Sequence, residues 1–228
     1  HFGRVNPLWQ ALILGVVEGV TEFLPVSSTG HLLIAEQWLD RRPDVFNVFI
    51  QTGAVLAVIL VFTRRLKGLL FGLRRPENRD YLIKLAAAFA LTGGGGLGLK
   101  AADFELPESA VPVAAAVLAG AAVIFLTEAW FRRRPQVSGL ITWKVVWAVA
   151  AGQIVAMVFP GTSRSAATII AAMLCGVGRP AATEFSFLVG IPTLLAAGLF
   201  EMAQAICAGE ITGALAVDLA VGFVAATV

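Results

Sequence analysis

Residues 15–31 read Gly-Val-Val-Glu-Gly-Val-Thr-Glu-Phe-Leu-Pro-Val-Ser-Ser-Thr-Gly-His, and this stretch decides the fold. It begins as an apolar helix that contains two carboxylates, Glu18 and Glu22. Residues four apart lie one turn apart on the same helical face, so these two carboxylates share a face. Pro25 ends the helix, because proline has no N–H to donate and its ring clashes with the preceding turn.

Hydroxyl side chains follow this break directly. Ser27, Ser28 and Thr29 are residue types that cap the N-terminus of a helix, so they predict the start of a second helix. His31 lies three residues after Ser28 and therefore shares its face of that second helix. Carboxylates, hydroxyls and an imidazole thus converge at one break in an apolar chain, which indicates a functional site.

The composition of the 228 residues is that of a membrane protein. Hydrophobic residues make up 58% and charged residues 14%, and the mean hydropathy is +0.83. Soluble domains carry about 25% charged residues. Several apolar runs reach the roughly 18–20 residues that cross the hydrocarbon core of a bilayer. The sequence therefore predicts an all-α, polytopic membrane helical bundle.

Positive charge is concentrated in two segments. Eleven of the seventeen Lys and Arg residues lie in residues 64–84 and 132–144, whereas residues 100–110 carry three carboxylates against one lysine. Cytoplasmic loops are enriched in Lys and Arg, so both basic segments are expected inside and residues 100–110 outside. The net charge of +2 does not indicate a nucleic-acid partner, because membrane spans flank both basic segments.

The apolar and polar runs predict the order of helices along the chain. The expected spans and shorter helices are residues 7–24, 28–39, 46–62, 81–99, 111–130, 143–159, 163–176, 183–206 and 213–228. The run Gly93–Gly96 favours an irregular helix over 81–99, because glycine destabilises the interior of a helix. Cys175 and Cys207 are expected to be buried packing residues. We treat residues 1–228 as one membrane domain, with a further C-terminal helix expected beyond them.

An internal repeat is predicted at an offset of 135 residues. Pro25 matches Pro160 and Ser28 matches Ser163, while Glu18 matches Gln153. Repeat 1 covers about residues 7–130 and repeat 2 about residues 143–228. Chance similarity between apolar segments is the alternative, but it does not account for the shared proline and hydroxyl break.

Because both basic segments are expected inside, the two repeats are expected to cross the membrane in opposite directions. Residues 7–39 are then a re-entrant helix hairpin that enters from outside, and residues 143–176 are one that enters from inside. Inverted-topology repeats place such broken helices near the middle of the membrane, where irregular backbone must line a cavity. We therefore expect the two hairpin tips to meet and to form one polar site.

The second tip brings a cation to this site. In Pro160-Gly-Thr-Ser-Arg-Ser-Ala-Ala-Thr168, Arg164 follows Ser163 at the start of a helix. An arginine inside a membrane protein is usually functional, and its guanidinium matches phosphate oxygens. The free N–H groups of a helix N-terminus also bind anions.

The first tip adds the chemistry of phosphoryl transfer. Glu18 and Glu22 suit a hard divalent cation, with Mg²⁺ expected and Ca²⁺ as the alternative. Ser28 and His31 are a nucleophile and a base one turn apart. Each group also has a plain structural explanation: the glutamates as ion pairs, the serines as helix caps, the histidine as a satisfied interior residue. Their convergence favours phosphoryl transfer on a lipid-borne substrate.

The two signature runs, residues 24–31 and 160–165, together with the Glu18-x-x-x-Glu22 pair, resemble the undecaprenyl-diphosphate phosphatase family, also known as the bacitracin-resistance proteins. The resemblance extends over nearly the whole chain. It implies removal of the terminal phosphate from undecaprenyl diphosphate, which recycles the lipid carrier of bacterial cell-wall synthesis. It also implies a metal-dependent enzyme of the bacterial plasma membrane whose site faces outward.

Residue roles follow from this resemblance position by position. Glu18 and Glu22 are the metal-linked acidic pair, Ser28 is the nucleophile with Ser27 as the alternative, and His31 is a base or an orienting group. The expected substrate-binding residues are Ser27, Thr29, Ser163, Ser165 and Thr168, with Arg164 in a catalytic role.

Two other functions remain open at this point. Inverted repeats with broken helices are also transporter architecture, so a transporter or flippase for a lipid phosphate or a small anion is the alternative. A transporter has little use for the Ser28 and His31 pair. A non-catalytic lipid-binding scaffold is a weaker alternative. A homodimer is compatible with a bundle of this size.

Overall fold

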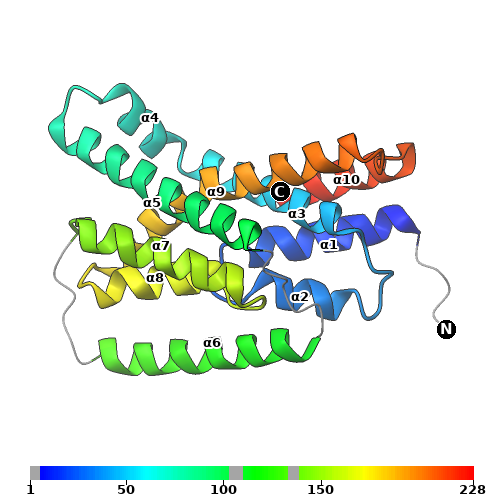
Figure 1. The fold of residues 1–228 in the computed structure, drawn as a ribbon, viewed down its shortest axis with the longest axis horizontal. Coiled ribbons are helices and arrows are strands. Elements are labelled where there is room, and N and C mark those ends of the chain that lie inside the picture. Colours follow the sequence, from blue (N-terminus) through cyan, green and yellow to red (C-terminus); the bar gives the residue numbers. More distant parts are fainter. Residues whose placement is uncertain (1–5, 103–109, 133–138) are drawn as a thin grey trace.

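The computed structural model describes residues 6–102, 110–132 and 139–228, and these residues form ten helices (Figure 1). Their bounds are α1 Pro7–Thr21, α2 Ser28–Ala35, α3 Asp44–Val61, α4 Thr63–Phe71, α5 Pro76–Ala101, α6 Ala110–Phe131, α7 Trp143–Val158, α8 Arg164–Leu174, α9 Arg179–Cys207 and α10 Gly213–Thr227. The all-helical prediction is confirmed. The acidic residues expected at 103–108, and Arg133 and Arg134, lie outside the described residues.

Four of the helices are long and apolar enough to cross a membrane: α3, α5, α6 and α9. Their mean hydropathy over 18 residues lies between 1.5 and 2.0. In α6 only 6% of that window is buried inside the protein, so the helix presents apolar side chains on nearly all sides. A helix that is apolar all round is suited to a lipid environment.

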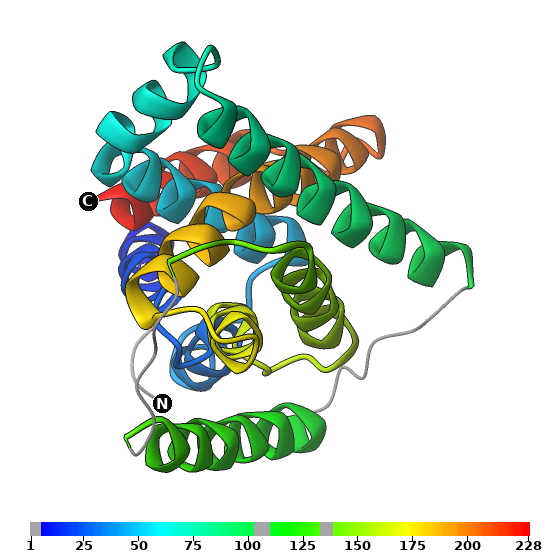
Figure 2. The same cartoon turned by 90° about the vertical axis from the view of Figure 1, so that its left-hand side faces the viewer.

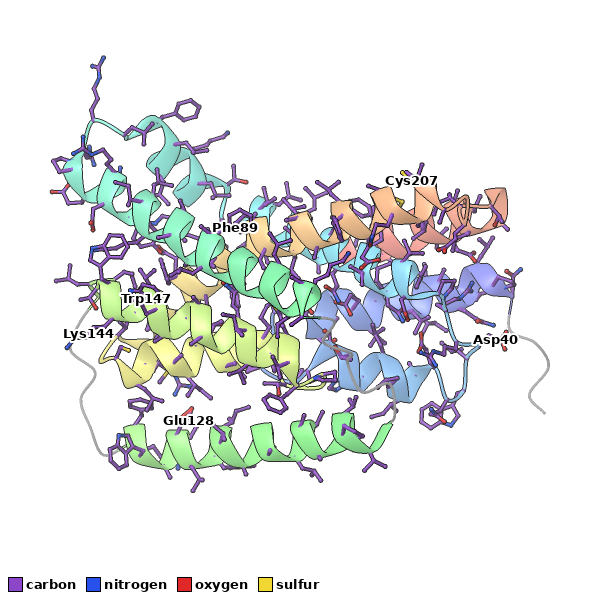
Figure 3. The ribbon with its side chains drawn as sticks, in the orientation of Figure 1. Asp40, Phe89, Glu128, Lys144, Trp147 and Cys207 are labelled. Atoms are coloured by element: carbon purple, nitrogen blue, oxygen red, sulfur yellow. The ribbon has the colours of Figure 1, made fainter. Side chains whose placement is uncertain are left out.

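Three local predictions need correction. The Gly93–Gly96 run does not interrupt α5, which is one helix of 26 residues. The loop expected after α3 contains a nine-residue helix, α4. Both cysteines are free and exposed rather than buried. Cys175 follows the last turn of α8, and Cys207 is the last residue of α9 (Figure 3).

Two helix pairs meet tip to tip in the middle of the molecule (Figure 1). The pair α1–α2 turns back at residues 22–27, and α7–α8 turns back at residues 159–163. The pairs point toward each other from opposite directions, as the sequence predicts for the two hairpins. Their entry into a bilayer from opposite faces, and the inverted repeat itself, stay predictions.

One helix of each predicted repeat packs on the hairpin of the other repeat. One apolar core joins α1, α2 and α3 with α10, and a second joins α7, α8 and α9 with α5. A third lies between α3, α4 and α9. Helix α10 therefore packs on the first hairpin and α5 on the second, so the described helices are tied together across both halves.

The contact between α1 and α10 depends on small residues. A side chain at Gly15 would overlap the backbone oxygen of Gly222, and one at Gly19 would lie 2.5 Å from the oxygen of Ala226. Glycine at these positions lets the two helix backbones approach closely, as is common between membrane helices. This contact holds α1, the helix that carries Glu18.

Charge is distributed unevenly along the long axis. Helix α4, the start of α5 and the turn between them carry seven of the seventeen Lys and Arg residues, and they lie at the same end as Lys144 (Figures 1 and 3). Asp40 lies at the opposite end (Figure 3). Because cytoplasmic loops are enriched in Lys and Arg, the basic end is expected on the cytoplasmic side, and this orientation stays a prediction.

Candidate active site

The first tip is a strained turn between α1 and α2. Ser27 has φ of 66° and ψ of 96°, the one positive φ among the described non-glycine residues. Its hydroxyl accepts a hydrogen bond from the Gly30 N–H at 3.2 Å, which caps α2 as the sequence predicts. Positive φ is costly for a residue with a Cβ and is found mostly at functional sites.

The second tip needs a glycine at its turn. Gly161 has φ of +95°, and a Cβ there would lie 2.6 Å from the backbone oxygen of Val113 in α6. The hydroxyl of Ser163 then caps α8 by accepting from the Ala166 N–H at 3.2 Å. The N-terminus of α8 is thereby placed beside the first tip.

Hydrogen bonds join the two tips. The Ser165 hydroxyl donates to the backbone oxygen of Leu24 at 2.9 Å. Because a hydroxyl has one hydrogen, the 3.0 Å contact between Ser163 and Ser165 must be donated by Ser163. Ser163 and Ser165 therefore connect the tips and align the start of α8.

Glu22 is the central residue of the site. One of its oxygens accepts a hydrogen bond of 2.6 Å from the Ser28 hydroxyl, and the other forms a 2.9 Å ion pair with Arg164. The side chains of Glu22 and Arg164 are 7% and 14% exposed, so the pair is screened little by solvent. A hydroxyl, a carboxylate and a guanidinium thus form one chain across the two tips.

Arg164 is held from three sides. Its guanidinium lies over the ring of Phe23 at 5.5 Å and is paired with Glu22. A Cβ at Gly190 of α9 would overlap the guanidinium, so the absence of a side chain there leaves room for it. The Nε atom of Arg164 is buried and has no hydrogen-bonding partner in the described part of the chain.

His31 and Thr168 have hydrogen-bonding partners other than those that their predicted roles suggest. The Nδ1 atom of His31 lies 2.8 Å from the backbone oxygen of Ser27, and the group that contacts the Ser28 hydroxyl is Glu22. Thr168 is buried, and its hydroxyl donates to the Arg164 backbone oxygen at 2.8 Å. Thr168 therefore lies behind the first turn of α8 and supports it.

A polar cavity of about 130 Å³ lies between the tips. It is lined by Glu22, Ser27, Ser28, Thr29, Gln51, Gln153, Ala156, Met157, Thr162, Ser163, Arg164 and Leu194. Sequence reasoning missed Gln51, Gln153 and Thr162 as lining residues. Two of them had a signal in the sequence: Gln153 is the repeat partner of Glu18, and Thr162 lies within the signature run 160–165.

The acidic pair partly fits a metal ion. The Glu18 side chain is fully buried, and among the described residues its carboxylate oxygens have no hydrogen-bonding partner apart from the neighbouring Glu22 carboxyl. It is close enough to Glu22 and Arg164 to interact with both electrostatically. Among the described residues there is no group of three or more His, Cys, Asp and Glu side chains suited to a metal. Two carboxylates with substrate oxygens and water would suit Mg²⁺, which takes few protein ligands.

An apolar groove of about 1020 Å³ leads away from the cavity. It runs between α6 and the α7–α8 pair, and α6 lies along one side of the molecule in both views (Figures 1 and 2). Ser27, Thr162 and Ser163 line both the groove and the cavity. The site therefore combines a small polar chamber with a long apolar channel.

Comparison with known proteins shows the family of the chain. Residues 11–228 match the family model described as bacitracin resistance protein BacA. A protein of Rhizobium etli named undecaprenyl-diphosphatase is 54% identical over 221 residues, covering 96% of this chain and 83% of that protein. Proteins of the same name from Xylella fastidiosa and Xanthomonas euvesicatoria are 49% and 48% identical, and the alignments cover 96% and 98% of this chain and 84% of each relative. The chain belongs to the bacitracin resistance protein family, BacA.

Proposed function

We propose that the cavity between the two tips hydrolyses undecaprenyl diphosphate to undecaprenyl phosphate and phosphate, and so recycles a lipid carrier of cell-wall synthesis. The observation that carries the proposal is the Ser28–Glu22–Arg164 chain, which places a nucleophile, a proton acceptor and a phosphate-binding cation in one polar cavity. The relatives named undecaprenyl-diphosphatase, at about 50% identity over most of the chain, support the substrate.

Ser28 is the nucleophile in this proposal. Its oxygen attacks the terminal phosphorus while its proton passes to Glu22, whose carboxylate already accepts the hydrogen bond. The bond between the terminal phosphorus and the bridging oxygen breaks, and undecaprenyl phosphate leaves. Water then hydrolyses the phosphoserine: the new P–O bond forms, the bond between phosphorus and the Ser28 oxygen breaks, one proton of the water goes to that oxygen, and the other stays on the released phosphate. Glu22 gives the proton that it took from Ser28 to solvent, which restores its carboxylate. Ser27 is the alternative nucleophile.

Phosphate charge is compensated mainly from the second tip. The N-terminus of α8 and the guanidinium of Arg164 face the cavity, together with the hydroxyl of Thr29. Ser163 contributes as the cap that holds this N-terminus, because its one hydroxyl hydrogen is donated to Ser165. These groups are fixed by the contacts between the tips before substrate arrives. Such preorganised donors stabilise the charge that builds on the transferring phosphoryl group. His31 is proposed as an orienting group at the edge of this site.

Glu18 and Glu22 would hold the divalent cation in this proposal, with Mg²⁺ expected and Ca²⁺ as the alternative. The cation would neutralise the phosphate oxygens of the bound diphosphate. Support comes from Glu18, whose buried oxygens have no other partner among the described residues.

The apolar groove beside α6 is proposed to receive the isoprenyl tail. Ser27 and Ser163 line both the groove and the cavity, so a lipid lying in the groove could present its diphosphate to the cavity. Its walls are chiefly Ala, Val, Ile and Phe side chains of α6, α7 and α8. Burial of apolar chain there contributes about 0.8 kcal/mol per CH₂ group.

We also propose the location and assembly. The basic end near Lys144 would face the cytoplasm of a bacterial plasma membrane, with the site open to the outer side, as the positive-inside rule predicts. A homodimer stays a prediction. The transporter alternative is not favoured, because the relatives carry the name of a phosphatase.

The test is phosphate release from an isoprenyl diphosphate by the detergent-purified protein, with Mg²⁺ or with EDTA. We expect metal-dependent release, and we expect Ser28→Ala to lower it about a hundredfold or more, because the attacking oxygen is lost. Thr63→Ala is the matched control, since the Thr63 hydroxyl only bonds carbonyls of the preceding turn of helix.

One result would contradict the phosphatase activity, and another would contradict the choice of nucleophile. An intact protein that releases no phosphate under any metal condition would rule out the phosphatase. Full activity in Ser28→Ala would leave the phosphatase in place and transfer the nucleophilic role to Ser27.

A further inference from the structure

The amide of Gln153 has one permitted orientation. Gln153 lies on α7 and is 1% exposed, and its Nε2 atom lies 2.9 Å from the hydroxyl oxygen of Thr92 in α5. The single hydrogen of that hydroxyl is donated to the backbone oxygen of Ala88 at 2.8 Å. Thr92 can therefore only accept from Gln153, so the NH₂ group must be the atom that faces Thr92. The Oε1 atom must be the one on the other side.

The close packing of α5 and α7 maintains this contact. A Cβ at Gly95 would lie 2.6 Å from the side chain of Ile154, so the glycine run lets α5 approach α7. Thr92 stands three residues before Gly95 and is fully buried. The glycine run thereby holds Thr92 against Gln153.

The Oε1 atom of Gln153 is a buried acceptor without a donor among the described residues. Leaving such an atom unsatisfied costs roughly 1–3 kcal/mol. Gln153 lines the same polar cavity as Ser28 and Arg164. A ligand in that cavity is therefore the available partner for Oε1.

The chemistry of the cavity restricts what that ligand can be. Ionised phosphate oxygens only accept hydrogen bonds, so they do not satisfy a second acceptor. A water molecule donates, and a cavity of about 130 Å³ has room for one. Hydrolysis of a phosphoanhydride consumes one water for each turnover.

We propose that Gln153 Oε1 accepts a hydrogen bond from the water that the hydrolysis consumes, and so positions that water for attack on phosphorus. This inference rests on the proposed phosphatase function. The water oxygen forms the new P–O bond, and its proton goes to the departing oxygen. Gln153 takes no proton and orients the attacking lone pair. Orientation by a fixed amide lowers the entropy cost of the step.

The test compares Gln153→Leu with Gln10→Leu in the full-length protein. Gln10 is also a buried glutamine with side-chain hydrogen bonds, but it contacts Asp40 at the end of the molecule away from the cavity. Both variants lose amide hydrogen bonds inside a helix bundle, so their losses of thermal stability are expected to be similar. Four quantities are measured: kcat, KM, the Mg²⁺ concentration for half-maximal rate, and the Kd of a non-hydrolysable isoprenyl methylenediphosphonate.

We expect Gln153→Leu to lower kcat about tenfold or more, the loss of one hydrogen bond that acts in the rate-determining step. The Kd of the analogue and the Mg²⁺ requirement should stay within about twofold of the intact protein, because neither phosphate nor cation is bound by Oε1 in this proposal. Gln10→Leu should keep the kcat of the intact protein.

Four outcomes would overturn the inference. A raised Mg²⁺ requirement in Gln153→Leu would make Oε1 a cation ligand, and a weakened Kd would make it a direct substrate contact. An unchanged kcat, or an equal fall in kcat in both variants, would leave Gln153 with a structural role only. An intact protein without activity would instead contradict the phosphatase itself.

Discussion

At the residue scale, one carboxylate of the cavity has two partners. Glu22 accepts from the Ser28 hydroxyl and pairs with Arg164, so the same group links the proposed nucleophile to the proposed phosphate-binding cation. The i, i+4 spacing of Glu18 and Glu22 suggests equivalent roles, but the structure separates them. Each oxygen of Glu22 has a protein partner, whereas Glu18 is fully buried and has only the Glu22 carboxyl beside it among the described residues.

Gly190 is predicted to be a positioning residue for Arg164. In Gly190→Ala the new Cβ would overlap the guanidinium and displace it from Glu22. We expect kcat/KM to fall about tenfold or more, since a misplaced phosphate-binding group loses its aligned interaction in the transition state. Steady-state kinetics of phosphate release measure this.

The control for this prediction is Gly93→Ala, because a Cβ at Gly93 meets open space. A double-mutant cycle with Arg164→Ala separates positioning from general damage. Once Arg164 is absent, Gly190→Ala should cause almost no further loss. Equal losses in both backgrounds would contradict a role exerted through Arg164.

At the scale of elements, close helix contacts place the first tip. Gly15→Val is expected to destabilise the protein, because the added side chain would overlap the backbone of Gly222 and the Cβ of Ala225. Overpacking costs about 1–3 kcal/mol where neighbours can adjust, and more where the obstacle is backbone. Thermal unfolding in detergent should show a lower Tm.

Gly94→Val is the matched variant on α5. It introduces the same β-branched residue into a helix, but a Cβ there meets no atom within 4 Å. A fall in Tm as large for Gly94→Val as for Gly15→Val would indicate helix propensity rather than the α1–α10 contact.

At the scale of the whole molecule, an ion pair joins segments far apart in the chain. Arg42, between α2 and α3, pairs with Asp218 of α10 at 2.6 Å and donates to the backbone oxygen of Pro7 at 2.6 Å. The two side chains are 11% and 9% exposed. The pair therefore ties the start of α1 and the α2–α3 connection to α10.

Asp218→Asn is expected to lower stability by up to about 3–5 kcal/mol, because it leaves the charge of Arg42 buried without its counter-ion. Glu128→Gln is the control, since its pair with Arg179 is exposed on both sides and such pairs contribute about 0–1 kcal/mol. Unfolding by heat in detergent distinguishes the two. Equal losses would mean that the Arg42 pair is no more important than a surface one.

Some features followed from sequence because they are local. The all-helical membrane class follows from composition and from the length of apolar runs, which the bilayer thickness sets. The grouping of Glu22, Ser27 and Ser28 follows from one stretch of chain, where a proline and capping residues determine the break. The residues that decide these features are close together in the sequence, so their spacing along the chain is sufficient to predict them.

Other features were decided by the tertiary structure. The pairing of Glu22 with Arg164, 142 residues later, and the presence of Gln51 and Gln153 in the cavity depend on how apolar helix faces pack. The exchange of α5 and α10 between the predicted repeats has the same origin. Apolar faces of similar composition can pair in several ways, and the local pattern does not choose among them. That choice depends on the fit of side chains and small residues along each helix contact.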